Sequence, residues 1–171
     1  MQIAFVTFNA DPKHSKAVRN MMKNASDFAS LGYRVSVLHC LPVKGMSKNL
    51  TYVRLGRQDG PFESVYRRFL TEVDQHITTN CFNVVYSILP ILRCGIYEPY
   101  DDLAQESVAK TGFLSGWFNR KKKLFADVER DLLSLATPPI VLCHSREMAS
   151  RITAAFNIKN IAVIPRASRP L

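Results

Sequence analysis

Short apolar runs alternate along this chain with longer segments in which apolar residues recur every three or four positions. Short apolar runs bounded by turn residues are typical of buried strands, and the three-to-four spacing is typical of amphipathic helices. The runs that we expect to form strands cover residues 3–8, 34–40, 51–55, 82–88, 140–144 and 161–165. This alternation predicts an α/β fold: a Rossmann-like open, mainly parallel sheet with helices on both faces.

The apolar spacing also predicts where the helices lie. The expected helices run between residues 18 and 29, between 62 and 77, between 112 and 136, and onward from the capping residue Ser145. Residues 89–110 are expected to be irregular, with one short helix. A chain of 171 residues with an apolar fraction of 47% can bury a core without disulfides or a metal. We therefore expect one domain over residues 1–171.

The charge balance constrains the partners. Lys and Arg number 23 against 14 Asp and Glu, so the net charge is +9 and anionic partners are favoured. The cations are spread along the chain, with one dense run at 120–123. This distribution is a weak signal for nucleic-acid binding, so we expect no nucleic-acid partner. The four cysteines are widely spaced and no secretory or membrane-spanning segment is seen, so we expect a cytoplasmic protein. We also expect that it holds no metal or cofactor.

The loops that follow the strands hold the candidate ligand-binding residues, because an open α/β sheet binds ligands at the carboxyl ends of its strands. The loop after the first strand has no glycine, which excludes a dinucleotide fingerprint and a Walker loop. Its cations can still bind an anion beside a helix N-terminus, or they are simply solvated. The candidate ligand-binding residues are Lys13, His14, Ser15, Lys16, Arg19, Tyr97, His144 and Ser145.

Three carboxylates beyond the central strand are the candidate catalytic residues. Glu98, Asp101 and Asp102 lie near two tyrosines, and such a cluster could bind hydroxyl groups or act as a base. Alternatively, the segment is a polar loop that caps the next helix. The histidines His39 and His144 follow their strands in equivalent positions, either lining one rim with His14 or hydrogen-bonding to nearby carbonyl groups.

The expected helix between residues 112 and 136 combines aromatic and basic residues in its first half. Lys121 falls near the middle of the apolar stripe, where a core helix would carry an aliphatic residue. Such a segment can lie in the interface of an anionic membrane, or it is a domain helix whose lysine stems cover apolar neighbours. The candidate membrane-binding residues are Trp117, Phe118, Arg120, Lys121, Lys122 and Lys123.

Several segments together resemble the N-terminal domain of two-domain GT-B glycosyltransferases of group 1 (family 4), in particular the lipopolysaccharide core glucosyltransferases. They are LGYRVSVLH, CGIYEPYDD, KTGFLSGWFNRKKKLFADVER, VLCHSREMASRITAAF and IAVIPRA. The resemblance implies that this domain binds a saccharide or lipid-linked acceptor and that an absent C-terminal domain binds the nucleotide-sugar. It also implies transfer with retention of configuration, and docking of the long helix on the cytoplasmic face of the membrane.

The sequence departs from the family pattern at the positions that the family uses for chemistry. Ser15 and Lys16 stand where the family has paired glycines. Gly95 and residues 101–104 occupy the positions where the family has an Asp before the Tyr of the central loop and a Gly-Gly-x-His. The glutamate pair of the family belongs to the second domain. We therefore expect an acceptor-binding half that is inactive alone. The alternative is a degenerate, non-catalytic domain that binds a glycan, an anionic membrane or a partner chain.

Overall fold

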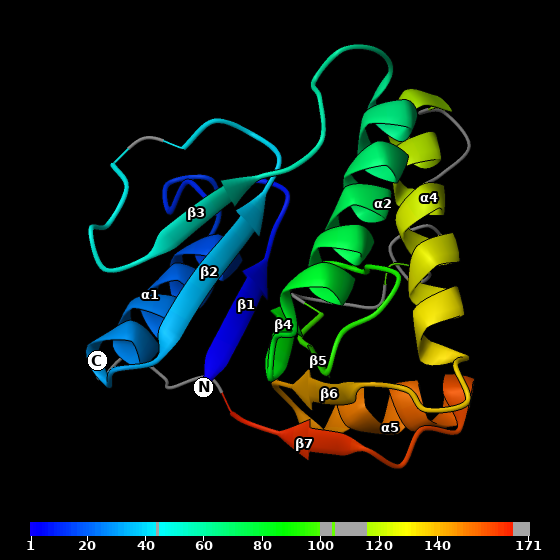
Figure 1. Cartoon of the computed structure of the whole chain (residues 1–171). Helices are drawn as coiled ribbons and strands as arrows, with labels where there is room; N and C mark the ends of the chain where they lie inside the picture. Colours follow the sequence, from blue (N-terminus) through cyan, green and yellow to red (C-terminus); the bar gives the residue numbers. More distant parts are fainter. Residues whose placement is uncertain (44, 100–103, 105–115, 166–171) are drawn as a thin grey trace, which may run out of the picture.

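The computed structural model describes residues 1–43, 45–99, 104 and 116–165. Within them the chain forms one seven-stranded sheet and four long helices (Figure 1). The strands are β1 (Gln2–Val6), β2 (Arg34–His39), β3 (Thr51–Arg54), β4 (Val84–Ser87), β5 (Ile96–Tyr97), β6 (Ile140–Cys143) and β7 (Ile161–Val163). The helices are α1 (Lys16–Ser30), α2 (Phe62–Asn80), α4 (Gly116–Leu133) and α5 (Arg146–Phe156).

All described strand pairs are parallel, and the strand order is β3-β2-β1-β4-β5-β6-β7. This order confirms the expected Rossmann-like open sheet. One element differs from the prediction: β5 lies inside residues 89–110, which were expected to be irregular. Ile96 pairs with Tyr86 and Ile140, and Tyr97 pairs with Ser87 and Val141. A strand of two residues is too short to produce a periodic pattern, so only its neighbours β4 and β6 define it.

Helices cover both faces of the sheet, as the sequence predicts. Ile3 and Phe5 of β1 pack with α1, whereas Ala4 and Val6 pack with α2 and α4. Because successive side chains of a strand point to opposite faces, α1 lies on one face and α2 and α4 lie on the other. Helix α5 packs on Val141 and on the other β6 and β5 residues that share its face. The core is therefore two apolar layers separated by the sheet.

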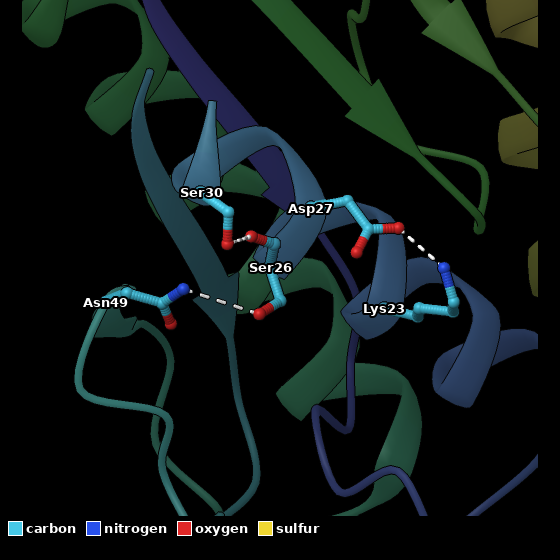
Figure 2. Close-up of polar contacts among 5 residues, drawn as sticks. All are labelled: Lys23, Ser26, Asp27, Ser30 and Asn49. Carbon is cyan, nitrogen blue, oxygen red and sulfur yellow. Dashed lines mark hydrogen bonds and ion pairs between the residues drawn. The ribbon is translucent and has the colours of Figure 1, made fainter. Parts of the chain in front are cut away.

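The helix ends follow the sequence signals. Ser15 and Ser145 each accept a hydrogen bond from the backbone N–H three residues on, at 3.2 and 3.1 Å, and so cap α1 and α5. Gly32, with φ of +87°, follows the end of α1. The outer side of α1 carries exposed polar contacts, among them the ion pair of Lys23 with Asp27 at 2.6 Å (Figure 2). Exposed pairs of this kind contribute little to stability.

An aromatic cluster joins α2 to α4. The Tyr66 side chain is fully buried, its ring stacks on Phe62, and it meets the edge of Phe125 at 4.8 Å between centroids. The Tyr66 hydroxyl donates a hydrogen bond to the Pro90 carbonyl oxygen at 2.5 Å. Phe8, just beyond β1, contacts the same rings. These contacts hold the start of α2 against the middle of α4, and Figure 1 shows the two helices side by side.

Candidate functional site: the carboxyl edge of the sheet

The strand order places a topological switch point between β1 and β4. From β1 the chain proceeds to β2 and β3 on one side, and it then returns to β4 on the other. In open α/β sheets ligands bind outside the carboxyl ends of the strands at such a point. The loop that follows β1 and the segment that follows β4 flank it, and the residues that follow β5 and β6 continue the same edge.

The loop after β1 is folded by its own polar side chains. The Asn9 and Asp11 side chains each accept a hydrogen bond from the backbone N–H two residues on, at 2.9 Å. Four of the five ligand-binding residues that the sequence predicts in and after this loop are exposed: Lys13, His14, Lys16 and Arg19. Ser15, the fifth, uses its hydroxyl oxygen to cap α1. The first turn of α1 therefore presents cations at a helix N-terminus, an arrangement that attracts anions.

Glu98 and His144, which sequence analysis singled out separately, lie together at the edge. Glu98 Oε1 is 2.8 Å from His144 Nε2, and the side chains are 17% and 21% exposed. The angles at this contact do not meet hydrogen-bond geometry, so it is an electrostatic contact that has its full strength when the imidazole is protonated. His144 Nδ1 lies 3.2 Å from the Ile164 carbonyl oxygen, which the ring N–H can donate to. Both ring nitrogens thus face oxygen atoms of the protein.

Tyr97, another predicted ligand-binding residue, is buried at 2% exposure. Its hydroxyl donates a hydrogen bond of 2.6 Å to Oε1 of Glu129, a fully buried glutamate of α4. The other carboxylate oxygen of Glu129 accepts a hydrogen bond of 2.6 Å from the Ala104 backbone N–H. Burial, reinforced by the Glu129 carboxylate, raises the pKa of Tyr97 well above its usual range. Tyr97 therefore remains a neutral phenol, and its buried side chain links β5 to Glu129 of α4 instead of facing a ligand.

His39 is separated from the other candidate histidines. It ends β2, four strands from β6, which corresponds to about 19 Å across the sheet. Its side chain is buried and its Nδ1 lies 2.9 Å from the Leu41 carbonyl oxygen. Burial lowers the pKa of His39. His39 and His144 thus do not form one rim, and each ring contacts a backbone carbonyl, which is the alternative that the sequence left open.

The basic run of α4 lies at the same end of the molecule. Arg120, Lys121 and Lys123 are exposed, and the Lys121 ammonium lies over the Phe62 ring at 4.7 Å from its centroid and 5.7 Å from that of Phe125. Partial burial there lowers the pKa of Lys121. No helix within the described residues is long and apolar enough to cross a bilayer.

Some predicted site residues cannot be placed. Asp101 and Asp102 lie outside the described residues, and so do the side chains of Trp117 and Phe118, although their backbone belongs to the first turn of α4. Ser145 is exposed and caps α5, and Lys122 is half-buried on the described part of α4.

Glu129 is a site-supporting residue that the reasoning from residue chemistry missed. Its signal was present in the sequence: it follows Phe125 by four residues and precedes Leu132 by three, so it falls on the apolar stripe of its helix. A carboxylate on such a stripe must find hydrogen-bond donors in the core, because burying it without them is costly. The donors, however, come from β5 and from Ala104, and only the tertiary structure brings these to α4.

The comparisons with solved structures define the fold class. Over 98% of its length the chain superimposes on WaaG, a glycosyltransferase involved in lipopolysaccharide biosynthesis, with a TM-score of 0.83 and 17% identity. It also superimposes on the sucrose-phosphate synthase of Thermosynechococcus elongatus, with a TM-score of 0.68 and 13% identity over 98% of the chain. No protein-family model matches the sequence, and no curated protein matches it significantly.

Both neighbours are GT-B glycosyltransferases, so the chain has a Rossmann-like half of the GT-B fold. The fold that the resemblance implied is thereby confirmed. The chain spans about half the length of these neighbours, 46% of WaaG and 48% of the synthase.

Proposed function

We propose that this chain is the acceptor-binding half of a retaining glycosyltransferase that acts in glycan or lipopolysaccharide-type synthesis. The observation that carries the proposal is the superposition on WaaG over nearly the whole chain, with a TM-score of 0.83. In this proposal the nucleotide-sugar binds to a second domain, so the chain alone binds an acceptor and catalyses no transfer. The expected location is the cytoplasm.

The charge distribution at the carboxyl edge supports an anionic acceptor. Several cations on the flanks of the helices are paired with carboxylates, as in the ion pairs of Arg67 with Glu63 and Arg130 with Asp127. Lys13, Lys16 and Arg146, beside the starts of α1 and α5, form no ion pair with any described residue. Unpaired cations beside helix N-termini favour a phosphate group. A phosphorylated or lipid-linked saccharide is therefore the acceptor class that we propose.

Titration calorimetry on the chain tests this assignment with glucose 6-phosphate and a uridine diphosphate sugar as probes. We expect glucose 6-phosphate to bind with a stoichiometry of one, because the cations of the α1 start attract its phosphate. Reversing Lys13 and Lys16 to Glu should abolish this binding, whereas reversing Lys48, an exposed lysine at the other edge of the sheet, should not. Stoichiometric binding of the nucleotide-sugar, or no binding of the sugar phosphate, would contradict the proposal.

We further propose that the first turns of α4 bring the domain to an anionic membrane surface. Arg120 and Lys123 are exposed there, and each basic residue near such a surface contributes about 1 kcal/mol, or roughly fivefold in affinity. Lys121 differs because its ammonium lies over two rings of its own domain. Its charge is therefore less available to lipid head groups than those of its neighbours.

Vesicle co-sedimentation measures this difference. Changing Arg120 and Lys123 together to Gln should weaken binding to phosphatidylglycerol-containing vesicles by about 25-fold. The single variant Lys121→Gln should weaken binding less than Arg120→Gln or Lys123→Gln alone. Lys23→Gln on α1 is the matched control, and zwitterionic vesicles should bind weakly. Binding that is insensitive to Arg120 and Lys123, or most sensitive to Lys121, would exclude this surface.

A further inference from the structure

We propose that the loop between β3 and α2, residues 55–61, is a second contact of the domain with an anionic lipid surface, and that Arg57 supplies its charge beside the first turns of α4. This inference rests on the membrane role proposed for α4 and extends that surface to another part of the chain. Two observations motivate it: Arg57 is exposed, and Phe62, the residue after the loop, packs against α4.

The loop lies at the end of the molecule where α4 begins. Helices α2 and α4 follow the parallel strands β3 and β5, so both start at the carboxyl edge of the sheet. Phe62, the first residue of α2, packs on Phe125 in the middle of α4, and the Lys121 ammonium lies over the Phe62 ring. The loop precedes Phe62, and Figure 1 shows it rising beyond the start of α2, at the end where the first turns of α4 lie.

Contacts with α2 and with the end of β2 hold the loop in place. The Gly56 N–H donates a hydrogen bond of 2.5 Å to Glu72 Oε2, and Gln58 Nε2 donates one of 3.3 Å to the Cys40 carbonyl oxygen. Gly56 has φ of +78°, and a Cβ there would lie 3.3 Å from both Cys40 Sγ and Phe69 Cβ. Because the loop is already held, it loses less conformational freedom on binding than a free loop would.

The carboxylates around the loop are paired with arginines of α2. Asp59 Oδ1 lies 2.7 Å from the Arg68 guanidinium, and Glu63 Oε1 lies 3.1 Å from that of Arg67. The pKa of Asp59 is lowered first by a backbone hydrogen bond, then by Arg68 and least by Arg57, so this carboxylate interacts mainly with groups other than Arg57. Arg57 itself forms no ion pair with any described residue. Its charge is therefore available to an anionic partner.

Arg54, at the carboxyl end of β3, adds to the charge at this end of the molecule. Its side chain is exposed, and its Nε donates a hydrogen bond of 3.1 Å to the Cys40 carbonyl oxygen. It too lies beyond ion-pair distance of every carboxylate in the described part of the chain. Arg120 and Lys123 of α4 are the other exposed cations of this surface.

An anionic lipid surface suits cations that come from two separate elements. Such a surface attracts every nearby basic residue and requires no fixed spacing between them. The first turn of α4 also contains Trp117 and Phe118, residue types that are common where a helix lies in the membrane interface. This composition favours lipid over nucleic acid as the polyanion that the loop and α4 share.

Vesicle co-sedimentation tests the loop with phosphatidylglycerol-containing vesicles. Arg57→Gln should weaken binding by about fivefold, the effect of one cation near such a surface, and it should do so again in the variant that lacks Arg120 and Lys123. Arg57→Lys keeps the charge and should bind like the parent. Arg34→Gln is the matched control, because Arg34 is exposed at the start of β2, at the opposite edge of the sheet. The urea midpoints of all these variants should equal that of the parent, since the changed side chains are exposed.

The outcomes separate this inference from the role proposed for α4. If the loss of Arg120 and Lys123 weakens binding while Arg57→Gln has no more effect than Arg34→Gln, the inference is wrong and the role of α4 stands. If only Arg57→Gln weakens binding, α4 does not contact lipid and a surface shared with the loop is wrong. If the parent does not bind anionic vesicles, both proposals are wrong. Tighter binding to duplex DNA than to vesicles, with the same dependence on Arg57, would assign the loop to nucleic acid and overturn the inference.

Discussion

Glu129→Ala is expected to lower the free energy of unfolding by about 3 to 5 kcal/mol, because it leaves two hydrogen-bond donors without an acceptor and removes a buried side chain. The change removes a fully buried side chain and leaves the Tyr97 hydroxyl and the Ala104 N–H without their acceptor. A buried donor without a partner costs about 1 to 3 kcal/mol by itself, and the lost volume adds to this. Urea denaturation followed by circular dichroism measures the change.

Two variants give the prediction its control. Asp131→Ala changes an exposed carboxylate of the same helix and should alter the stability by less than about 0.5 kcal/mol. Glu129→Gln keeps the shape and one acceptor oxygen, so its cost should lie between those of the two alanine variants. Equal stabilities for Glu129→Ala and Asp131→Ala would show that the carboxylate does not hold the segment around Glu98.

Tyr66→Ala is expected to cost about 3 to 5 kcal/mol, as truncation of large buried aromatic residues generally does. The ring is fully buried and contacts the rings of Phe62 and Phe125, which belong to different helices. Its loss should therefore weaken the packing of α4 on α2 as well as the core beneath β1. Thermal and denaturant unfolding measure the effect on stability.

Tyr66→Phe separates the hydroxyl from the ring. It keeps the packing and removes only the hydrogen bond to the Pro90 carbonyl oxygen, so we expect a cost of about 1 kcal/mol. Phe28→Ala is the matched control on α1, because the Phe28 ring is 39% exposed and its removal should cost clearly less than that of Tyr66. A cost for Tyr66→Ala that is no greater than for Phe28→Ala would contradict a central role for the cluster.

Local patterns predicted most of the fold, because each long element satisfies its own rule. Most apolar residues of α1 recur at helical spacing and are buried, and Ser145 acts as the cap that the sequence predicts. Strand β5 was missed for the opposite reason. Its two residues are too few to show a period, and only their pairing with β4 and β6 identifies them as a strand. Without β5 the sequence analysis could not place Glu98 beside His144, because the pairing of β5 with β6 brings these two residues together.

The candidate site was only half predictable. The rule for open sheets selected the loops of Lys13, Glu98 and His144 from the sequence, but it ranked none of them above the others. The sequence marks Lys121 as an anomaly within an apolar stripe, which fits either a membrane contact or a lysine stem that covers apolar neighbours. The structure places its ammonium over the Phe62 ring, a residue 59 positions earlier in the chain, and no local pattern can express such a contact.

The sequence by itself determined the class of fold, the order and approximate position of the long elements, and the edge of the sheet where we expect the binding residues. These follow from interactions between residues near one another in the chain, namely helical spacing, caps and the alternation of strands with helices. Only the tertiary structure decided that Glu98 meets His144 and that Glu129 holds the chain around them. Those contacts join residues 25 to 46 positions apart in the sequence, and the packing of α4 against β5 and the sheet order bring them together.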